Sequence, residues 1–396
     1  MKKNRISMVV FAYYPSDVRV RRAAEALAGA SMEVDVIALR GDGEAKKDQV
    51  NSVNIYRINL KRKRAGKLRY IWQWGYFIAA AFLKLSYLHL FKRYQLVHVH
   101  NMPDILVFSA LMPKLTGAKL IIDLHDPMPE VFMTKFNLDE NHPIIKFIRL
   151  LEKWSIKFAD LVITTNISFR DLFVSRSCPP SKVHIIMNSP QEIVFNKYKH
   201  QSKQDRNGLK DAFDIMYHGN IVEMHGLDLA LEAVAKIRDK ISNLTLHVYN
   251  DGTYMPQIQK LVDELRIRDI VKFHGIVPID DIAEAVSRLD VGIVPNKMTP
   301  FTNLNMPTRI FECLFMEKPV IVPKTQGISD YFDENSIYFF EPDNVDSLAE
   351  QLVNVYLQKG DKSRIVERGV EIFRQYRWEL QQKKLVKLVK ELIVGG

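Results

Sequence analysis

The sequence predicts an α/β fold made of two domains, each with a parallel sheet flanked by helices. Two observations carry this prediction. Short apolar runs typical of buried strands alternate with helical stretches, and this alternation stops once in a polar stretch and then restarts. A length of 396 residues is enough for two hydrophobic cores. We predict a first domain over 1–190, a linker over 191–210, a second domain over 205–373, and a final helix over 374–396 that packs back on the first domain.

The first domain contains six strand-like runs, separated by helical patterns over 23–30 and 143–157. A run bounded by turn residues and short enough for a strand is typical of a parallel sheet covered on both faces. The runs are "ISMVVFAYY", "EVDVIAL", "LVHVH", "KLIIDLH", "ADLVITTN" and "KVHIIMN".

The polar stretch "KYKHQSKQDRNGLKDAF" separates these runs from a second set. In that second set we expect helices to begin near Gly226, Met255, Ile279, Thr308 and Val345, and a long basic helix over 378–393 ends the chain. The strand-like runs are "FDIMYHG", "LTLHVYNDG", "VKFHG", "VGIVP", "PVIVP" and "IYFFEP".

The first predicted helix begins with an unusual charge pattern. Ser16 or Asp17 is a good N-cap. The first turns then carry Arg19, Arg21 and Arg22, although the positive end of a helix dipole favours acids. Two interpretations stay open: a solvated basic face that pairs with Glu25, or a site where free N–H groups and guanidinium groups share a phosphate.

The net charge of +10 is confined to one segment. Residues 49–103 contain no acid and ten basic residues, and the rest of the chain has 46 basic and 46 acidic residues. A local basic patch favours an anionic surface, either nucleic acid or acidic lipid. The basic residues are Arg57, Lys61, Arg62, Lys63, Arg64, Lys67, Arg69, Lys84, Lys92 and Arg93.

Aromatic residues within this segment favour lipid. "RYIWQWGYFIAAAFLKLSYLHLFKR" has its longest uncharged run over 70–83, which is shorter than the roughly 20 residues that span a bilayer. We therefore expect a helix lying in a membrane interface, with Trp72 and Trp74 at headgroup level and Lys61, Arg62, Lys63 and Arg64 attracting anionic lipid. The alternative is a buried helix preceded by a basic loop. No recognised nucleic-acid motif accompanies the patch, so we expect no nucleic-acid partner.

The remaining general features exclude several classes. There is no G-x-G-x-x-G, Walker A, Ser-His-Asp or zinc-spaced motif, which argues against a simple dehydrogenase, a kinase or a zinc protein. Cys178 and Cys313 belong to no paired motif and suit a reducing compartment. The start "MKKNRISMVVFAYY" does not read as a signal peptide, so we expect a cytoplasmic protein.

Two motifs in the second half carry a family resemblance. "MYHGNIVEMHGLDLALEAV" places glycines between a strand and a helix, where backbone can approach a phosphate. "MPTRIFECLFMEKPVIVPK" places Glu312 on the second turn of a helix before a buried strand. With "HVHNMPDILVFSALMPKLTGAKLIIDLHDPMPE" and "FEPDNVDSLAEQL", these stretches resemble the retaining family-4 glycosyltransferases of GT-B fold, over nearly the whole chain. The resemblance implies two Rossmann-like domains facing across a cleft.

The resemblance also implies residue roles. Glu312 matches the glutamate that binds the nucleotide ribose, Gly219 the glycine of the pyrophosphate loop, and His125 the donor-site histidine of the first domain. The remaining donor-side candidates are Gly252, His274, Val277, Asn303, Asn305 and Thr308. On the acceptor side the candidates are Asp17, Arg19, Asp126 and Glu130, for the last two of which helix capping remains an alternative.

The chain departs from the family pattern at two cations. The family usually has Arg where this chain has Asn220 and Lys where it has His225. Both cations neutralise the leaving diphosphate, so we expect Arg309 to replace them, with a surface helix arginine as the alternative. Leu304 also stands where the family has a first glutamate, and its neighbours Asn303 and Asn305 could bind the sugar.

The expected protein is a metal-independent retaining hexosyl- or N-acetylhexosaminyl-transferase without a cofactor. It would move a sugar from a nucleotide-diphosphate donor to a lipid-linked or polysaccharide acceptor in cell-surface glycan synthesis, on the inner face of the membrane. Two alternatives remain: a nucleotide-sugar epimerase of the same fold, and a non-catalytic membrane-bound partner, which the residues at 220 and 225 favour.

Overall fold

The computed structural model describes residues 4–61, 67–195, 199, 212–358 and 364–395. The chain divides into two compact units: unit 1 is Met1–Met187 with Glu379–Gly396, and unit 2 is Asn188–Trp378. The predicted first boundary at 190 lies close to the observed one. Most of the predicted linker over 191–210, and the predicted membrane-binding residues Arg62, Lys63 and Arg64, lie outside the described residues.

Unit 1 contains an eight-stranded sheet with the order β3-β4-β2-β1-β5-β6-β7-β8. All neighbours are parallel except β3 and β4, which are antiparallel. The strands are β1 (Arg5–Tyr13), β2 (Glu33–Leu39), β3 (Lys47–Val50), β4 (Val53–Ile58), β5 (Leu96–His100), β6 (Lys119–Leu124), β7 (Leu161–Thr164) and β8 (Val183–Ile185).

Strands β3 and β4 were not predicted. β3 reads "KDQV" and is mostly exposed, so it lacks an apolar signal, and it is a strand because its backbone pairs with β4. β4 alternates between buried and half-buried positions over its first four residues and ends in two buried ones, so it carries a weaker apolar signal than the central strands.

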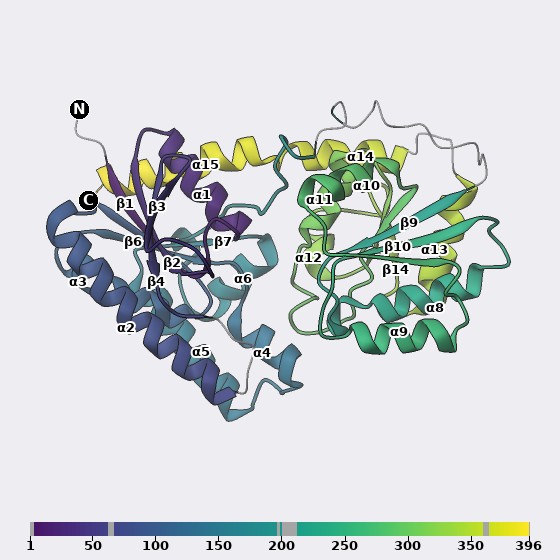
Figure 1. Cartoon of the computed structure of the whole chain (residues 1–396), viewed down its shortest axis with the longest axis horizontal. Helices are drawn as coiled ribbons and strands as arrows, with labels where there is room; N and C mark the ends of the chain where they lie inside the picture. The colour runs from purple at the N-terminus through teal and green to yellow at the C-terminus, as the bar shows by residue number, and fades with distance from the viewer. Residues whose placement is uncertain (1–3, 62–66, 196–198, 200–211, 359–363, 396) are drawn as a thin grey trace. The chain divides into compact units, whose positions relative to one another are not determined.

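Helices cover the sheet of unit 1 (Figure 1). Helix α1 begins after Asp17, whose Oδ1 accepts from the backbone N–H groups of Arg19 and Val20, so Asp17 is the N-cap. The helices are α1 (Val18–Gly29), α2 (Lys67–Lys92), η1 (Asp104–Ala110), α3 (Leu111–Leu115), α4 (Met128–Phe136), α5 (Pro143–Phe158), α6 (Ile167–Arg176) and η2 (Pro180–Lys182).

The last helix, α15 (Trp378–Val394), belongs mostly to unit 1. Buried Gln381 accepts a hydrogen bond of 3.0 Å from the backbone N–H of Met187, and Leu385 and Val389 are buried. Figure 1 shows α15 beside α1. The chain therefore returns to its first unit through apolar contacts and a buried hydrogen bond.

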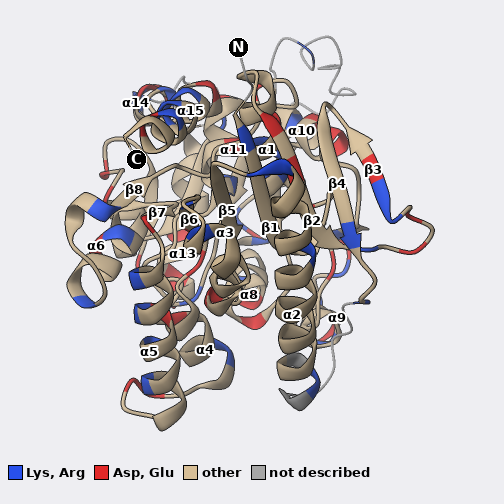
Figure 2. Cartoon of the chain, turned by 90° about the vertical axis from the view of Figure 1, so that its left-hand side faces the viewer, with Lys and Arg blue, Asp and Glu red and all other residues tan. Residues whose placement is uncertain are grey.

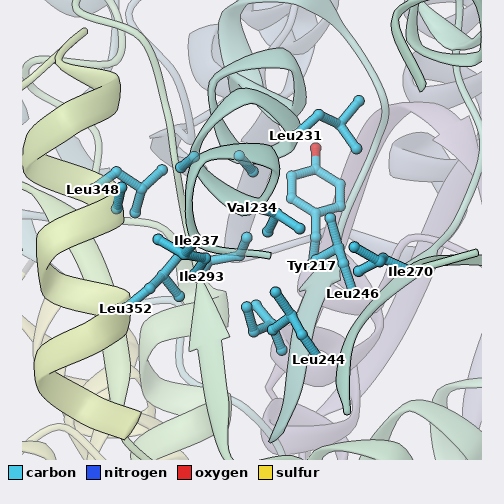
Figure 3. Packing of buried hydrophobic residues seen from close by; sticks show 14 of the residues in the cluster. Tyr217, Leu231, Val234, Ile237, Leu244, Leu246, Ile270, Ile293, Leu348 and Leu352 are labelled. Carbon is cyan, nitrogen blue, oxygen red and sulfur yellow. The ribbon is translucent and has the colours of Figure 1, made fainter. Parts of the chain in front are cut away.

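Unit 2 contains a six-stranded, fully parallel sheet with the order β11-β10-β9-β12-β13-β14. Its core joins the strands to α8 and α13, and Figure 3 shows Tyr217 and Leu246 of the sheet beneath Leu231 and Val234 of α8. The strands are β9 (Phe213–His218), β10 (Leu244–Tyr249), β11 (Val271–Gly275), β12 (Val291–Ile293), β13 (Val320–Pro323) and β14 (Tyr338–Phe340). The helices are η4 (Glu223–His225), α8 (Leu227–Ile237), α9 (Met255–Glu264), α10 (Ile279–Arg288), α11 (Thr308–Phe315), α12 (Gln326–Ser329), α13 (Val345–Leu357) and α14 (Arg364–Arg374).

Candidate active site

The strand order of unit 2 marks where a ligand can bind. Successive strands extend the sheet from β9 toward β11 on one side, whereas β12 to β14 extend it on the other. Parallel α/β sheets bind ligands beyond the carboxyl ends of the strands at such a switch point. Gly219 follows β9 and Asn296 follows β12, so both lie at this point.

Arg309, near the start of α11, bridges the two strands. One guanidinium nitrogen donates to the His218 carbonyl over 2.9 Å, and another donates to Asn296 Oδ1 over 3.1 Å. The guanidinium also lies over the Tyr217 ring, 5.4 Å from its centroid. Arg309 is therefore held in a fixed position at the switch point, rather than extending from a helix into solvent. Its role as the cation that neutralises a diphosphate stays a prediction.

Glu312 lies one turn further along α11 and contacts the end of β9. His218 Nε2 donates to Glu312 Oε2 over 2.7 Å, and both side chains are largely buried. This places a carboxylate and an imidazole beside Gly219. Carboxylate oxygens accept well from hydroxyl groups, so the pair has the chemistry to bind a ribose.

The loop after Gly219 folds back on itself. His225 Nδ1 donates to the Asn220 carbonyl over 2.7 Å, because a carbonyl can only accept. Burial, with a smaller effect from Arg309, lowers the pKa of His225 to about 4. At neutral pH His225 is therefore uncharged, and its Nε2 can only accept. Neither Asn220 nor His225 adds a positive charge to the site.

The other predicted donor residues line the same sheet edge. Gly252 follows β10, and a Cβ there would lie 2.0 Å from the Ile221 carbonyl oxygen, so only glycine fits. Val277 follows β11 in a loop. His274 stacks on the Tyr249 ring with centroids 4.2 Å apart, and its Nε2 is 3.0 Å from His247 Nδ1.

Three further donor-side candidates, Thr308, Asn303 and Asn305, have structural partners. Thr308 Oγ1 and the Asn188 side-chain amide are 3.1 Å apart. Asn303 Oδ1 accepts from the Gln326 N–H over 3.1 Å. The Asn305 carbonyl faces Gly327, where a Cβ would lie 2.7 Å from it. These residues therefore shape the loop before α11.

Unit 1 contains a buried histidine cluster at the carboxyl ends of β5 and β6. Asp123 Oδ2 is 3.2 Å from His98 Nε2 and 3.3 Å from His100 Nδ1. His100 Nδ1 is also 3.0 Å from His125 Nε2. A proton on His100 Nδ1 can be donated to Asp123 Oδ2 and to His125 Nε2. His125 Nε2 then accepts, so a neutral His125 carries its own proton on Nδ1.

The charges of the cluster follow from burial and hydrogen bonds. Burial lowers the pKa of His125 to about 3. Burial opposes ionisation of Asp123, but the imidazoles of His125, His100 and His98 hold its pKa well below the ordinary value. Burial likewise lowers the pKa of His98, to about 4. At neutral pH Asp123 is therefore a carboxylate that lies beside the uncharged imidazoles of His98 and His125.

Asp17, Arg19 and Asp126 lie next to this cluster. Arg19 donates to Asp17 over 3.4 Å, and its guanidinium is 3.8 Å from Asp126 Oδ2. Burial raises the pKa of Asp17, but the Arg19 charge outweighs it and brings the pKa to about 2. The interpretation as a solvated basic face that pairs with Glu25 is wrong for Arg22, which is 4% exposed.

Glu130 requires a correction, because we predicted that it contacts acceptor or donor hydroxyls. The two carboxylate oxygens of Glu130 accept from Arg176 over 2.6 and 2.9 Å, and the residue is 3% exposed. Arg176 also binds buried Glu152 over 2.8 Å. Glu130 is thus one partner in a buried ion triad.

The expected membrane residues divide into two groups. Trp72 is 60% exposed, whereas Trp74 packs on Phe132 with ring centroids 6.5 Å apart and belongs to an interior cluster with α4 and α5. Lys61 forms an exposed ion pair of 2.5 Å with Asp42. Trp74 is therefore not positioned as an interfacial anchor.

The expectation that this segment is too short to span a bilayer is also corrected. Within α2, the 22 residues Ile71–Lys92 are long and apolar enough to cross a membrane by length and composition. The longest uncharged run underestimates the length of this apolar segment, because an isolated lysine such as Lys84 ends the run without ending the segment. Phe77, Ala81 and Leu85 are fully buried, however, so one face of α2 packs on the core of unit 1.

Sequence reasoning missed five residues of these clusters. A strand that ends in "DLH" places Asp123 and His125 on one face, and "HVH" does the same for His98 and His100, so strand alternation could have identified them. His218 and Asn296 carry no such signal.

Donor atoms of His98, His100 and Asp123 lie within 4.8 Å of one another and could hold a metal ion. The predicted metal independence stays a prediction.

Comparison with known families gives two matches. Residues 16–189 match the profile described as "Glycosyl transferase 4-like domain", and residues 212–358 match "Glycosyl transferases group 1". The alpha-D-kanosaminyltransferase of Streptomyces kanamyceticus is 20% identical over 240 residues, 58% of each chain. The sulfoquinovosyl transferase SQD2 of Arabidopsis thaliana is 20% identical over 300 residues, 73% of this chain and 55% of that protein. These alignments span less than two thirds of the relatives' lengths.

Solved structures with the same fold cover the whole chain. A sucrose-phosphate synthase from Thermosynechococcus elongatus has a TM-score of 0.82 at 16% identity, with full coverage of both chains. HepE of Anabaena in complex with UDP-glucose has a TM-score of 0.72 at 12% identity and covers 98% of this chain and 99% of that one. WaaG, a glycosyltransferase involved in lipopolysaccharide biosynthesis, has a TM-score of 0.71 at 15% identity over 99% and 100%.

Proposed function

The chain belongs to the group 1 glycosyltransferases of GT-B fold, and from this premise we propose that it moves a sugar from a nucleotide-diphosphate donor to a lipid-linked or polysaccharide acceptor. The observation that carries the proposal is Arg309, a fixed cation at the switch point of unit 2, beside the Glu312–His218 pair. A diphosphate needs a cation and free N–H groups, and a ribose needs a carboxylate. The UDP-glucose complex of HepE supports this class of donor.

We assign the donor diphosphate to Arg309 and to the backbone of the loop that begins at Gly219. Negative charge develops on the diphosphate as the sugar leaves, and a fixed guanidinium stabilises that charge without moving. Because His225 is uncharged at neutral pH, Arg309 carries this stabilisation. Glu312 receives the ribose hydroxyls, with His218 orienting its carboxylate.

The transfer retains the anomeric configuration in this proposal. The acceptor attacks from the face that the diphosphate leaves, and a phosphate oxygen accepts the acceptor proton. No side chain is then required as a dedicated base. His125, neutral and protonated on Nδ1, donates a hydrogen bond to the transferred sugar, and Asp123 fixes that tautomer through His100. The enzyme requires no metal or cofactor in this scheme.

A lipid-linked acceptor would be reached at a membrane surface. We propose a peripheral protein on the cytoplasmic face, which acts in cell-surface glycan synthesis. The acid-free segment over 49–103 and the exposed Trp72 support this placement. Names of relatives such as the amylovoran biosynthesis glycosyltransferase AmsK of Erwinia amylovora support a polysaccharide acceptor class.

A non-catalytic partner is the second candidate, because Asn220 and the uncharged His225 stand where the family usually has two cations. The test incubates purified protein with single UDP-, GDP- and ADP-sugars, without and then with a membrane extract. Sugar transfer that depends on the extract supports our proposal. Nucleotide binding without turnover supports the non-catalytic candidate, and isomerisation of the donor without extract indicates an epimerase.

A further inference from the structure

Helix α2 exposes an apolar stripe that the fold of unit 1 leaves uncovered. We call six of its residues the α2 stripe, and their exposed fractions lie between 45% and 71%. The stripe extends over 19 residue steps, about 28 Å at 1.5 Å per residue. Its members are Trp72, Tyr76, Leu83, Tyr87, Leu90 and Phe91.

The opposite face of α2 is already used. Phe77, Ala81 and Leu85 repeat every four residues and are fully buried against unit 1. α2 is thus apolar on both faces, and within the described part of the chain only the face with Phe77, Ala81 and Leu85 is packed on unit 1. A helix that served only the core would carry polar residues on its outer face.

Helix α5 adds a second stripe in the same unit. Ile144, Phe147, Leu150 and Trp154 are 47%, 57%, 41% and 51% exposed, and we call them the α5 stripe. Both helices border the interior cluster that contains Met128, Met133, Ile145 and Ile148, where Trp74 meets α4 and α5. Figures 1 and 2 show α2 and α5 in the same part of unit 1.

Charge decides which partner these stripes fit. Lys146, Lys153 and Lys157 are exposed along α5, and its one acid, Glu152, is buried. α2 has no acid, and Arg69 and Arg93 are exposed near its two ends. Figure 2 shows this distribution, with basic residues along α5 and few charges on α2. Within the two helices the exposed charges are therefore all basic, and they lie among aromatic and aliphatic side chains. The exposed Glu140 precedes α5 and pairs with Arg149 over 3.5 Å.

We propose that the α2 and α5 stripes together form the surface by which unit 1 lies on an anionic lipid bilayer. Aromatic and aliphatic side chains enter the interface, and the lysines meet the anionic headgroups. A second copy of the chain fits less well, because two such surfaces would bring like charges together. The proposal deepens the proposed function and rests on its lipid-linked acceptor. It makes these stripes, rather than Trp74, the principal membrane contacts, and the predicted lipid contacts of Arg62, Lys63 and Arg64 stay predictions.

The test measures flotation of the full chain with vesicles of phosphatidylglycerol and phosphatidylcholine. Leu83→Asp on α2 and Phe147→Asp on α5 should each reduce the bound fraction about tenfold, because a carboxylate opposes insertion at a lipid-facing position. Leu357→Asp is the matched control, since Leu357 is 74% exposed on α13 of unit 2, and this variant should bind like the wild type. All variants should keep the affinity of the wild type for UDP.

The outcomes separate this surface from the proposed function. Wild-type protein that does not float with anionic vesicles at low salt, or variants that float unchanged, would overturn the surface even if sugar transfer occurs. A dimer in light scattering that Leu83→Asp dissociates, without vesicle binding, would assign the stripes to a second copy and also overturn it. Vesicle binding that only the stripe variants lose supports the surface even if no donor is turned over.

Discussion

Arg309 occupies the space that a side chain at Gly219 would need. A Cβ on Gly219 would lie 2.7 Å from Arg309 Nη1, and the glycine has a φ of +142°, which L side chains rarely adopt. The same guanidinium donates to the carbonyl of His218, the preceding residue. The end of β9 and the cation at the start of α11 therefore fit each other only when residue 219 lacks a side chain.

Gly219→Ala should displace Arg309 and reduce kcat by more than tenfold, with a loss of stability of about 1–3 kcal/mol because alanine rarely adopts a φ of +142°. Most of the clash is with the end of a flexible side chain, which can move. Gly226→Ala is the contrasting variant, because its Cβ would lie 1.8 Å from the Pro295 carbonyl oxygen. This oxygen belongs to the backbone and cannot move aside as a side chain can. Thermal unfolding should show a much larger loss for Gly226→Ala. Equal losses of stability in the two variants would contradict this difference.

Arg309→Ala should reduce kcat by about 10²–10³-fold, the typical effect of removing one fixed donor to a developing charge. Asn220→Ala should change kcat by a few-fold at most, since the hydrogen bonds of Asn220 to the described residues go to its carbonyl, which the substitution keeps. Turnover with the donor found in the sugar screen measures both. Small and equal effects would mean that another group neutralises the diphosphate.

Glu312→Ala should weaken binding of the cognate nucleoside diphosphate, whichever of UDP, GDP and ADP the wild type binds, by ~1–3 kcal/mol through the loss of charged hydrogen bonds to the ribose. Titration calorimetry measures this, and Glu350→Ala on the exposed face of α13 serves as the control. A Glu312 variant with wild-type affinity for UDP, GDP and ADP would remove the ribose assignment.

Arg176→Met should destabilise unit 1 by about 3–5 kcal/mol, because it leaves two buried carboxylates without their cation. Glu130 and Glu152 are 3% and 0% exposed, so water cannot replace the guanidinium. Chemical denaturation followed by circular dichroism is the measurement. The exposed pair of Lys383 with Glu379 provides the control, and Lys383→Met should cost less than about 1 kcal/mol.

Asp104 should make the stability of the protein fall as the pH rises toward neutral. Burial, and secondarily Glu152, raises the pKa of Asp104 from 3.8 to about 7, so the unfolded chain releases this proton first. Between these two pH values the folded state binds the extra proton, so the free energy of unfolding decreases with pH and then levels off. Asp104→Asn should remove this decrease and be more stable than the wild type at pH 8, by about 1–3 kcal/mol. A pH series of urea denaturations tests it, and parallel curves for the two proteins would contradict the assignment.

The strands and helices that bury apolar residues were predictable from the sequence. The buried strands β1, β2, β5 and β9 appear as apolar runs because each is covered on both faces. Asp17 as an N-cap and Gly226 before α8 also follow from local backbone requirements. The edge strand β3 does not, because its structure depends on pairing with β4 and not on its own side chains.

The sequence by itself determined the two-domain α/β fold, the family, and the presence of Glu312, Arg309 and His125 at strand and helix ends. Only the tertiary structure decided what these side chains contact. Glu130 pairs with Arg176, 46 residues away in the sequence, and so leaves the list of candidate site residues. His218 joins that list because it binds Glu312, 94 residues away. The physical reason is the sequence separation over which each signal acts. Helix and strand propensity, capping and hydrophobic periodicity depend on residues a few positions apart, so they can be recognised in the sequence. An ion pair or hydrogen bond between distant residues exists only once the folded sheet has brought the strand ends and helix starts together.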